Sequence, residues 1–212
     1  MSNDYPLTNS KILPAATGQA VFTQTGEKNT QIAHANNVNQ VINIILPMSA
    51  HRTGNARNAT VSLNLDIYNL FVIGEEDFQG DHFIVQKERA LTESTSNEIK
   101  EQFSALGADA IARIKTFPTL FASENHQYGR TDVDHMAYFG VVTDLKIQDN
   151  GVKVYFQKYS EVPQQKLNEI QFELALEKAA FFNELNRTHW AIKRVNLLEA
   201  LRAAGISVLA YT

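Results

Sequence analysis

The sequence predicts an α+β fold: antiparallel strands that form a small barrel or twisted sheet, with flanking helices and a polar N-terminal β-arm. Three observations support this prediction. Several segments alternate apolar and polar residues, an Asn-Gly pair separates two of them, and other segments space their apolar residues as a helix does. The composition, with 44% hydrophobic and 20% charged residues, is typical of a chain that buries a core.

The N-terminal arm differs from the rest of the chain in composition. Ser, Thr, Asn, Gln and Gly dominate residues 1–58, where two short apolar runs stand at 20–22 and 41–48. Residues 49–58 are mostly small and polar, as in a loop or linker. We therefore divide the chain into a self-associating arm, residues 1–58, and an α+β body, residues 59–212.

Alternation predicts the first strands of the body. Apolar side chains at every second residue share one face of a half-buried sheet, and here they are Val61, Leu63, Leu65 and Ile67. Residues 70–73 and 82–85 are predicted as two further strands on either side of the acidic turn at 74–77. We expect these strands to pair in antiparallel order.

Two short helices are expected next. Thr95 and Glu98 have the spacing of a capping box, in which a Thr hydroxyl and a Glu carboxylate bond free amide groups at a helix start. Apolar residues then recur at helical spacing up to Gly107, namely Ile99, Phe103 and Leu106. A second helix is predicted over residues 108–115.

A β-hairpin is the strongest short-range prediction. The pattern predicts strands over residues 118–122 and 137–147, and alternating apolar residues continue from 152 to 156. Between the last two segments stands Asn150-Gly151, a pair that supplies the positive φ angles of a type I′ turn. We expect the sheet to be built around this hairpin.

The C-terminal quarter is predicted to be mainly helical. Pro163 begins one helix, whose apolar residues are Leu167, Ile170 and Leu174. Asn196 is expected to cap a last helix that ends at Gly205, and residues 206–211 are predicted as a final strand.

Composition also excludes several classes of site. The chain has no Cys, which removes disulfides, zinc-thiolate sites, iron–sulfur clusters and thiol nucleophiles, and which favours a cytoplasmic location. No apolar run is long enough to span a bilayer, so we expect no membrane association. The formal net charge of -4 argues against a general attraction to nucleic acid. The common phosphate-loop, dinucleotide, nucleophile-elbow and zinc-helix motifs are missing, so we predict no cofactor and no catalytic residues.

Within the arm, residues 30–38 are chemically suited to β-stacking. Gln and Asn side chains form amide ladders between copies while apolar residues enter a dry seam, and the residues expected to do so are Gln31, Ile32, Asn36 and Val38. Their order resembles the RIP homotypic interaction motif and related amyloid signalling motifs of bacterial and fungal immune proteins, although Ala33 stands where the motif has Gly. The resemblance implies a signalling assembly. The alternative is an ordered β-arm that packs on the body or swaps between identical subunits.

A polar loop at residues 124–135 is the candidate metal site. Imidazole nitrogens and carboxylate oxygens together suit zinc, manganese or iron. The candidate ligands are Glu124, His126, Asp132, Asp134 and His135. The alternative interpretation is a loop that is polar because it faces water.

A basic segment around the single Trp is the candidate partner surface. Trp and Arg are residue types that anchor protein interfaces, and the candidates here are Arg187, His189, Trp190 and Arg194. The alternative is a Trp buried in the core, with its flanking charges in solvent. Together with residues 117–122 and 138–142, this segment is similar to uncharacterised bacterial proteins associated with defence against phage.

These features favour a non-enzymatic adaptor or regulatory subunit. We expect it to self-associate through the arm, to bind a second protein, and to act in bacterial antiphage defence. One alternative is a metal-dependent hydrolase or nuclease that uses the loop at 124–135. Another is a small-barrel nucleic-acid-binding protein that uses the outer face of the predicted hairpin, with Lys153, Tyr155 and Lys158.

Overall fold

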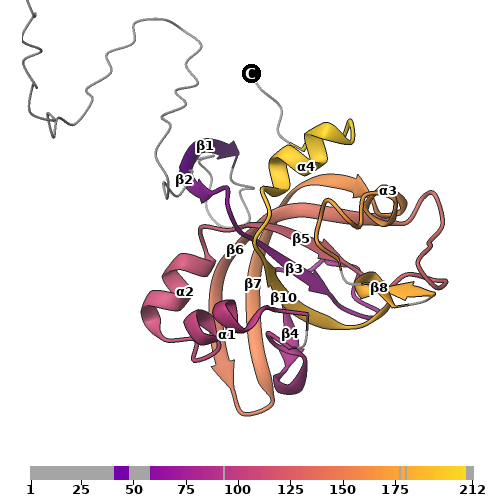
Figure 1. Ribbon diagram of the computed structural model, residues 1–212. Coiled ribbons are helices and arrows are strands. Elements are labelled where there is room, and N and C mark those ends of the chain that lie inside the picture. Colours follow the sequence, from indigo (N-terminus) through magenta and orange to yellow (C-terminus); the bar gives the residue numbers. More distant parts are fainter. Residues whose placement is uncertain (1–40, 48–57, 93, 177, 180, 209–212) are drawn as a thin grey trace, which may run out of the picture. The chain divides into compact units, whose positions relative to one another are not determined.

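The computed structural model describes residues 41–47, 58–92, 94–176, 178–179 and 181–208. It confirms the predicted α+β class, with a six-stranded sheet and helices that pack on both of its faces (Figure 1). By its internal contacts the chain divides into residues 1–37 and residues 38–212, so every described residue belongs to the second unit. None of the helices in this part of the chain has the length and apolar content of a membrane span.

The six-stranded sheet is mixed and open. Its order is β10–β3–β5–β6–β7–β4, and the strands span His189–Lys193 (β10), Tyr68–Val72 (β3), Pro118–Ala122 (β5), Met136–Gln148 (β6), Gly151–Pro163 (β7) and His82–Gln86 (β4). β3 and β5 run parallel, whereas the other neighbours in the sheet pair antiparallel. This parallel pair departs from the expected antiparallel sheet, and the strands expected to pair with one another, at residues 59–67, 70–73 and 82–85, pair with other strands instead. The connection between β3 and β5 contains β4, a 3₁₀-helix and two α-helices, and it is long enough for the chain to cross over and return in the same direction.

The chain that follows β4 crosses to the opposite edge of the sheet. The Leu91 N–H donates to the Trp190 carbonyl on β10 at 2.9 Å, and the Ile192 N–H donates to Thr95 Oγ1 at 3.3 Å. This crossing occupies part of the outer edge of β10, while β10 and β4 do not pair with each other. Of the two predicted forms, the protein therefore adopts the twisted sheet and not the closed barrel.

The first helix, α1 (Asn97–Phe103), does not begin with the predicted capping box. Ser96 is its N-cap and makes no side-chain capping bond. Thr95 is buried instead, and its hydroxyl accepts a hydrogen bond from the Ile192 N–H of β10. The second helix, α2 (Ala108–Ile114), follows as predicted, to within one residue.

A separate two-stranded sheet precedes the main one. β1 (Val41–Pro47) pairs antiparallel with β2 (Asn58–Asn64). β2 ends where Asn64 Oδ1 accepts the Asp66 N–H at 2.9 Å, a turn-forming bond that stops the alternation predicted to continue to Ile67. A strand of the expected arm thus pairs with the first strand of the expected body, and the division after residue 58 stays a prediction.

The predicted hairpin is confirmed as β6 and β7, but its turn lies one residue earlier. Gln148 pairs with Gly151, so Asp149 and Asn150 form the loop. Neither Asn150 nor Gly151 has a positive φ, which corrects the expected type I′ turn. Packing requires Gly151 instead, because a Cβ there would collide with the Val85 carbonyl oxygen of β4.

Two further helices lie after the hairpin. α3 (Gln164–Glu169) is shorter than the helix predicted there, and turns follow it. α4 (Leu197–Ala203) is capped by the Asn196 side chain as predicted, and the predicted Gly205, which has φ +73°, directly follows its C-cap, Ala204. Residues 206–208 form no strand, because the chain folds back onto the last turn of α4, and the rest of that predicted strand lies outside the described residues.

Four short elements complete the described part of the chain: the 3₁₀-helices η1 (Lys87–Arg89) and η2 (Glu184–Asn186), and the strands β8 (Lys178–Ala179) and β9 (Phe182–Asn183).

The sheet separates two hydrophobic cores. The first core is rich in aromatic residues and includes side chains of α1 and α2; among its members are Phe71, Phe83, Phe103, Ile114, Phe121 and Trp190. The second core is mainly aliphatic and includes side chains of α3 and α4; among its members are Leu70, Val72, Leu120, Leu167 and Leu201. Successive residues of β3 alternate between the two cores, so this strand is buried on both faces.

Candidate functional site

The candidate site is built on residues 123–135, the loop that joins β5 to β6. Buried amide side chains hold this loop to α3 and to β9; we call them the amide cluster, and they are Asn125, Gln164, Asn168 and Asn183. Asn125 Nδ2 donates to Asn168 Oδ1 at 2.9 Å, and Asn183 Nδ2 donates to the same oxygen at 2.8 Å. Gln164 Nε2 donates to Asn125 Oδ1 at 3.0 Å. Because buried amides are stable only when they are paired, this cluster fixes the three segments relative to one another.

A further amide, Asn186, fixes the tip of the loop. Its Oδ1 accepts the Gly129 N–H at 2.8 Å, and its Nδ2 donates to the Gln127 carbonyl at 2.7 Å. Gln127 and Arg130 also exchange backbone hydrogen bonds of 3.1 and 3.2 Å. Gly129 has φ +64°, a conformation that L side chains rarely adopt, so the tight turn depends on glycine. The backbone of the tip is therefore ordered without a ligand.

The fixed tip lines a solvent-open cavity of about 570 Å³. We call its lining the aromatic groove; it consists of Gln127, Tyr128, Gly129, Arg130, Gln171, Phe181 and Phe182. Tyr128 is 76% exposed, Phe181 81% and Phe182 45%, and the rings of Tyr128 and Phe182 lie 6.5 Å apart. Aromatic surface in contact with water is stabilised when a ligand covers it. The groove is therefore chemically suited to binding.

Arg130 gives the aromatic groove its charge. The other lining residues that the structure describes are aromatic, amide or glycine. A guanidinium recognises a carboxylate or phosphate through two parallel hydrogen bonds, and it keeps its charge at all ordinary pH values. The arrangement suits a ligand that carries an apolar group next to an anionic one.

Sequence patterns alone do not point to the aromatic groove. One signal was present in the two adjacent Phe residues, Phe181 and Phe182, because adjacent side chains of an extended segment point to opposite sides and do not both enter one core. Tyr128 lies inside the polar loop, whose His and carboxylate residues point to metal binding instead.

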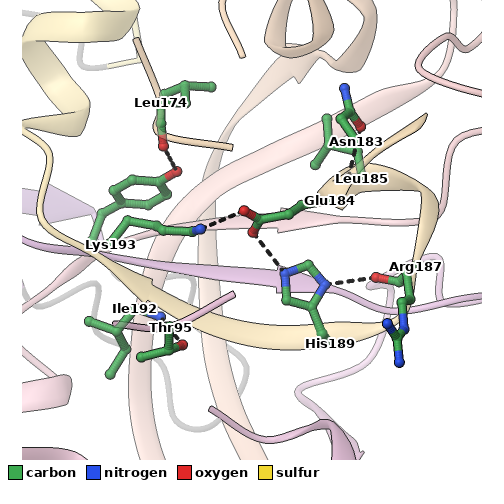
Figure 2. Close-up of polar contacts among 10 residues, drawn as sticks. Thr95, Leu174, Asn183, Glu184, Leu185, Arg187, His189, Ile192 and Lys193 are labelled. Atoms are coloured by element: carbon green, nitrogen blue, oxygen red, sulfur yellow. Dashed lines mark hydrogen bonds and ion pairs between the residues drawn. The ribbon is translucent and has the colours of Figure 1, made fainter. Parts of the chain in front are cut away.

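A second buried polar group, the ion cluster, lies between β10 and η2 (Figure 2). Lys193 Nζ bonds Glu184 Oε1 at 2.5 Å, and His189 Nε2 lies 3.1 Å from Glu184 Oε2. His189 Nδ1 lies 2.7 Å from the Arg187 carbonyl oxygen, so both ring nitrogens face an acceptor. Burial raises the pKa of Tyr68 well above its ordinary value, and the nearby Glu184 carboxylate adds a smaller contribution in the same direction. These contacts hold β10 to η2 and leave the charges of the cluster inside the fold.

Two of the four residues of the predicted partner surface are buried. Trp190 is 0% exposed and stacks on Phe71 with ring centroids 5.1 Å apart, and His189 belongs to the ion cluster. A side chain inside the core cannot anchor a partner, which corrects the prediction for these two residues. Arg187 and Arg194 are exposed, and their role in binding stays a prediction.

The two predicted His ligands pair with neighbouring side chains. His126 Nδ1 lies 2.6 Å from Asp132 Oδ2, and His135 Nε2 lies 3.0 Å from Ser123 Oγ. The two imidazole rings meet edge to face with centroids 4.4 Å apart. Burial, and then the nearby His126, lower the pKa of His135, which favours its neutral form.

The remaining predicted metal ligands do not join the two His residues. Glu124 Oε1 accepts the backbone N–H and the hydroxyl of Thr188, each at 2.6 Å, and Asp134 is exposed. Among the described residues no group of three or more His, Asp or Glu side chains is arranged to hold a metal ion. The metal interpretation gains no support from this geometry.

Of the three residues predicted to bind nucleic acid, Lys153 and Tyr155 lie close together, whereas Lys158 lies over a different ring. Lys153 Nζ lies 5.2 Å from the centre of the Tyr155 ring on β7, and Lys158 Nζ lies 4.0 Å from that of Tyr138. Asp144 is the cross-strand neighbour of Tyr155, so a carboxylate accompanies the lysines. Nucleic-acid binding stays a prediction.

The residues predicted for self-association lie outside the described residues; they are Gln31, Ile32, Asn36 and Val38. The role of the arm therefore stays a prediction as well. No family model, no curated protein and no solved structure matches this chain.

Proposed function

We propose that this protein is a non-enzymatic adaptor that binds a partner protein in the aromatic groove. The observation that supports the proposal is the exposure of Tyr128, Phe181 and Phe182 around a cavity whose walls are held by buried amides. The ligand is a short segment of the partner in which an aromatic or aliphatic side chain stands next to an acidic residue. In this proposal the groove takes the place of the surface that was predicted around Trp190.

The size and chemistry of the aromatic groove fit a peptide side chain. Its volume of about 570 Å³ falls within the ~300–1,000 Å³ that is common for ligand sites. Aromatic residues supply large contact area with few rotatable bonds, and they dominate the residues that anchor protein interfaces. The Arg130 guanidinium sets the sign of the charge that the partner brings.

The amides behind the groove lower the entropic cost of binding. Ordering a flexible side chain at an interface costs about 0.5–1.5 kcal/mol, and ordering a flexible loop costs more. Asn186 already bonds both Gln127 and Gly129, so the backbone of the tip has little freedom left to lose. We expect the partner to bind with little movement of this backbone.

We further propose that the arm, residues 1–58, gathers several copies of the adaptor. The amide and apolar side chains of Gln31, Ile32, Asn36 and Val38 support this role by their order. Joined copies present several grooves, and a partner with repeated segments binds such an array more tightly than it binds one copy. The resemblances to amyloid signalling motifs and to phage-defence proteins support a role in bacterial antiphage defence, and the absence of Cys supports a cytoplasmic one.

A peptide selection tests the groove. The full-length protein is immobilised and used to select binders from random peptides displayed on phage, and an enriched peptide is synthesised with a fluorescent label. Its affinity is measured by fluorescence anisotropy for the wild type and for Arg130→Glu. We expect the enriched peptides to carry an acidic residue beside an apolar one. R130E should bind the labelled peptide at least about tenfold more weakly than the wild type does, because hydrogen bonds to charged groups contribute ~1.5–3 kcal/mol.

Arg194→Glu is the matched control, because it reverses an exposed Arg on the surface that was predicted first. Its affinity should equal that of the wild type. A library that enriches no peptide, or a peptide that R130E binds as well as the wild type does, contradicts the proposal. If R194E weakened peptide binding and R130E did not, the partner would bind the basic segment around Trp190 and not the aromatic groove.

A further inference from the structure

β4 lies at one edge of the six-stranded sheet, and no strand of the described residues lies beside its outer backbone edge. Its inner edge pairs antiparallel with β7, with Ile84 opposite Lys153 and Phe83 opposite Val154. Side chains alternate between exposed and buried along the strand, as a sheet edge over a core requires. The opposite edge of the sheet, β10, differs, because the chain around Leu91 bonds to it.

The hydrogen-bond pattern shows which residues of β4 face outward. The Phe156 N–H donates to the Asp81 carbonyl at 3.2 Å, which makes these two residues a hydrogen-bonded pair. Bonded pairs recur at every second residue of an antiparallel ladder, so Phe83 and Val85 bond to β7. The backbone N–H and C=O groups of the alternate residues, His82, Ile84 and Gln86, therefore point away from β7. The Gln86 C=O is the exception, because it accepts the first backbone bond of η1, whose N-cap is Gln86; no other described residue forms a backbone hydrogen bond with the remaining outward groups.

The sequence of β4 leaves this outward edge unprotected. Natural edge strands are usually protected by Lys, Pro or an inward-pointing charge, which prevent pairing with another chain. β4 reads His-Phe-Ile-Val-Gln and contains no Lys, Arg, Asp, Glu or Pro. Ile84, at its centre, is 42% exposed. Oppositely charged residues stand just outside the strand, Asp81 before it and Lys87 after it.

We propose that β4 pairs antiparallel with β4 of a second copy of this chain, across a two-fold axis at Ile84. In this register Ile84 meets Ile84 of the second copy, and His82 meets Gln86. These are the residues whose backbone groups point outward, so the new ladder uses the edge that β7 leaves open. Asp81, whose carboxylate also contacts His82 Nδ1 of its own chain at 2.6 Å, lies opposite Lys87 of the other copy, the first residue of η1. The symmetry thus adds two ion pairs.

The arrangement of charge favours a second copy over an unrelated strand. An isologous interface requires a surface that is complementary to itself under a two-fold rotation. β4 meets this condition, because an acid and a base stand at equal distances on either side of Ile84. The exposed Ile84 side chains become cross-strand neighbours, a pairing that favours β-branched residues. The dimer joins two six-stranded sheets into one continuous sheet.

Charge reversal of full-length protein tests the register. The mass in solution is measured by light scattering after size-exclusion chromatography for the wild type, Asp81→Lys and Lys87→Asp, up to about 100 μM, because small interfaces are weak. We expect the wild type to have an even number of chains. In each variant both ion pairs become like-charge pairs, so β4 pairing should weaken by about tenfold or more.

Mixing the two variants restores opposite charges at both positions. D81K supplies two bases and K87D supplies two acids, so an equimolar mixture should recover the wild-type mass, which a folding defect would not permit. Glu101→Lys, an exposed acid on α1, is the matched control and should assemble as the wild type does. Wild-type protein that stays monomeric, variants that assemble like the wild type, or a mixture that stays dissociated would each overturn the proposal. Peptide affinity of R130E is measured separately, so failure of the aromatic groove and failure of this pairing are distinguishable.

Discussion

Two groups of aromatic side chains in this protein share the same chemistry and differ in exposure. In the first core, Phe121 and Trp190 lie on either side of Phe71 in the sheet, and their rings stack on it at 5.7 and 5.1 Å. In the aromatic groove, the rings of Tyr128 and Phe181 are mostly in water. Paired strands and two helices enclose the core rings, whereas a loop and a two-residue strand carry the groove rings. Aromatic composition alone therefore does not separate residues that stabilise the fold from residues that are free to bind.

The largest difference between the two groups is expected in stability. Trp190→Ala should lower the free energy of unfolding by about 3–5 kcal/mol, because it leaves a cavity in the first core. Trp190→Phe should cost less, since the ring stacking on Phe71 is retained and the buried Trp190 Nε1 has no hydrogen-bond partner among the described residues. Guanidinium denaturation followed by circular dichroism measures both. A loss below about 1 kcal/mol for W190A would show that Trp190 contributes little to the stability of the first core.

The groove should show the opposite behaviour. Phe182→Ala should leave the free energy of unfolding within about 0.5 kcal/mol of the wild type, while it weakens the selected peptide by about 2 kcal/mol, or roughly 30-fold. Phe172→Ala is the control, because Phe172 is 88% exposed and does not line the groove. Denaturation and fluorescence anisotropy are measured on the same preparations. Equal effects of the two substitutions on affinity would show that exposure alone does not identify the binding residues.

Asn186 holds the tip of the loop that carries Tyr128, so its replacement should affect both stability and peptide affinity moderately. Asn186→Ala leaves the Gly129 N–H without its partner and removes one of the two donors to the Gln127 carbonyl, at about 1–2 kcal/mol of stability. Hydrogen exchange of the Gly129 amide should become faster. Asn186→Asp keeps the acceptor for Gly129 and should restore its protection in part. Unchanged exchange in N186A would mean that the tip is ordered by other contacts.

The smallest effect is expected from pH. Burial and His126 lower the pKa of His135 below the ordinary value of 6.5. As the pH falls below that value the unfolded chain takes up the proton first, so the free energy of unfolding decreases until the pH reaches the lowered pKa of the folded state. His135→Gln removes this contribution. Denaturation at about pH 7.5 and about pH 5.5 should therefore show a larger loss for the wild type than for H135Q. Equal losses would contradict the assignment.

Several elements were predictable because their signals are local. β5 spans Pro118–Ala122, the range that the sequence predicts, and Asn196 caps α4 as expected. Alternation and capping depend on residues a few positions apart, so the chain need not be folded for them to be recognised. Even in these elements, tertiary contacts changed the position of a turn and the role of a capping residue. The turn of the hairpin shifted by one residue, and Thr95 bonds β10 instead of capping α1.

The candidate site depended on contacts between distant residues. β10 contains His189 and Lys193, which suggest a polar surface until Glu184 is placed beside them. The aromatic groove likewise exists only where the loop tip meets residues around Phe181.

The sequence by itself determined the α+β class, most strand positions and the capped end of the last helix, because periodicity and capping operate within one segment. Only the tertiary structure decided that β5 runs parallel to β3, that Trp190 is buried and that Tyr128 is exposed. The physical reason is that pairing and burial depend on which distant segments meet. Exposure is therefore a property of the folded chain and not of the residue.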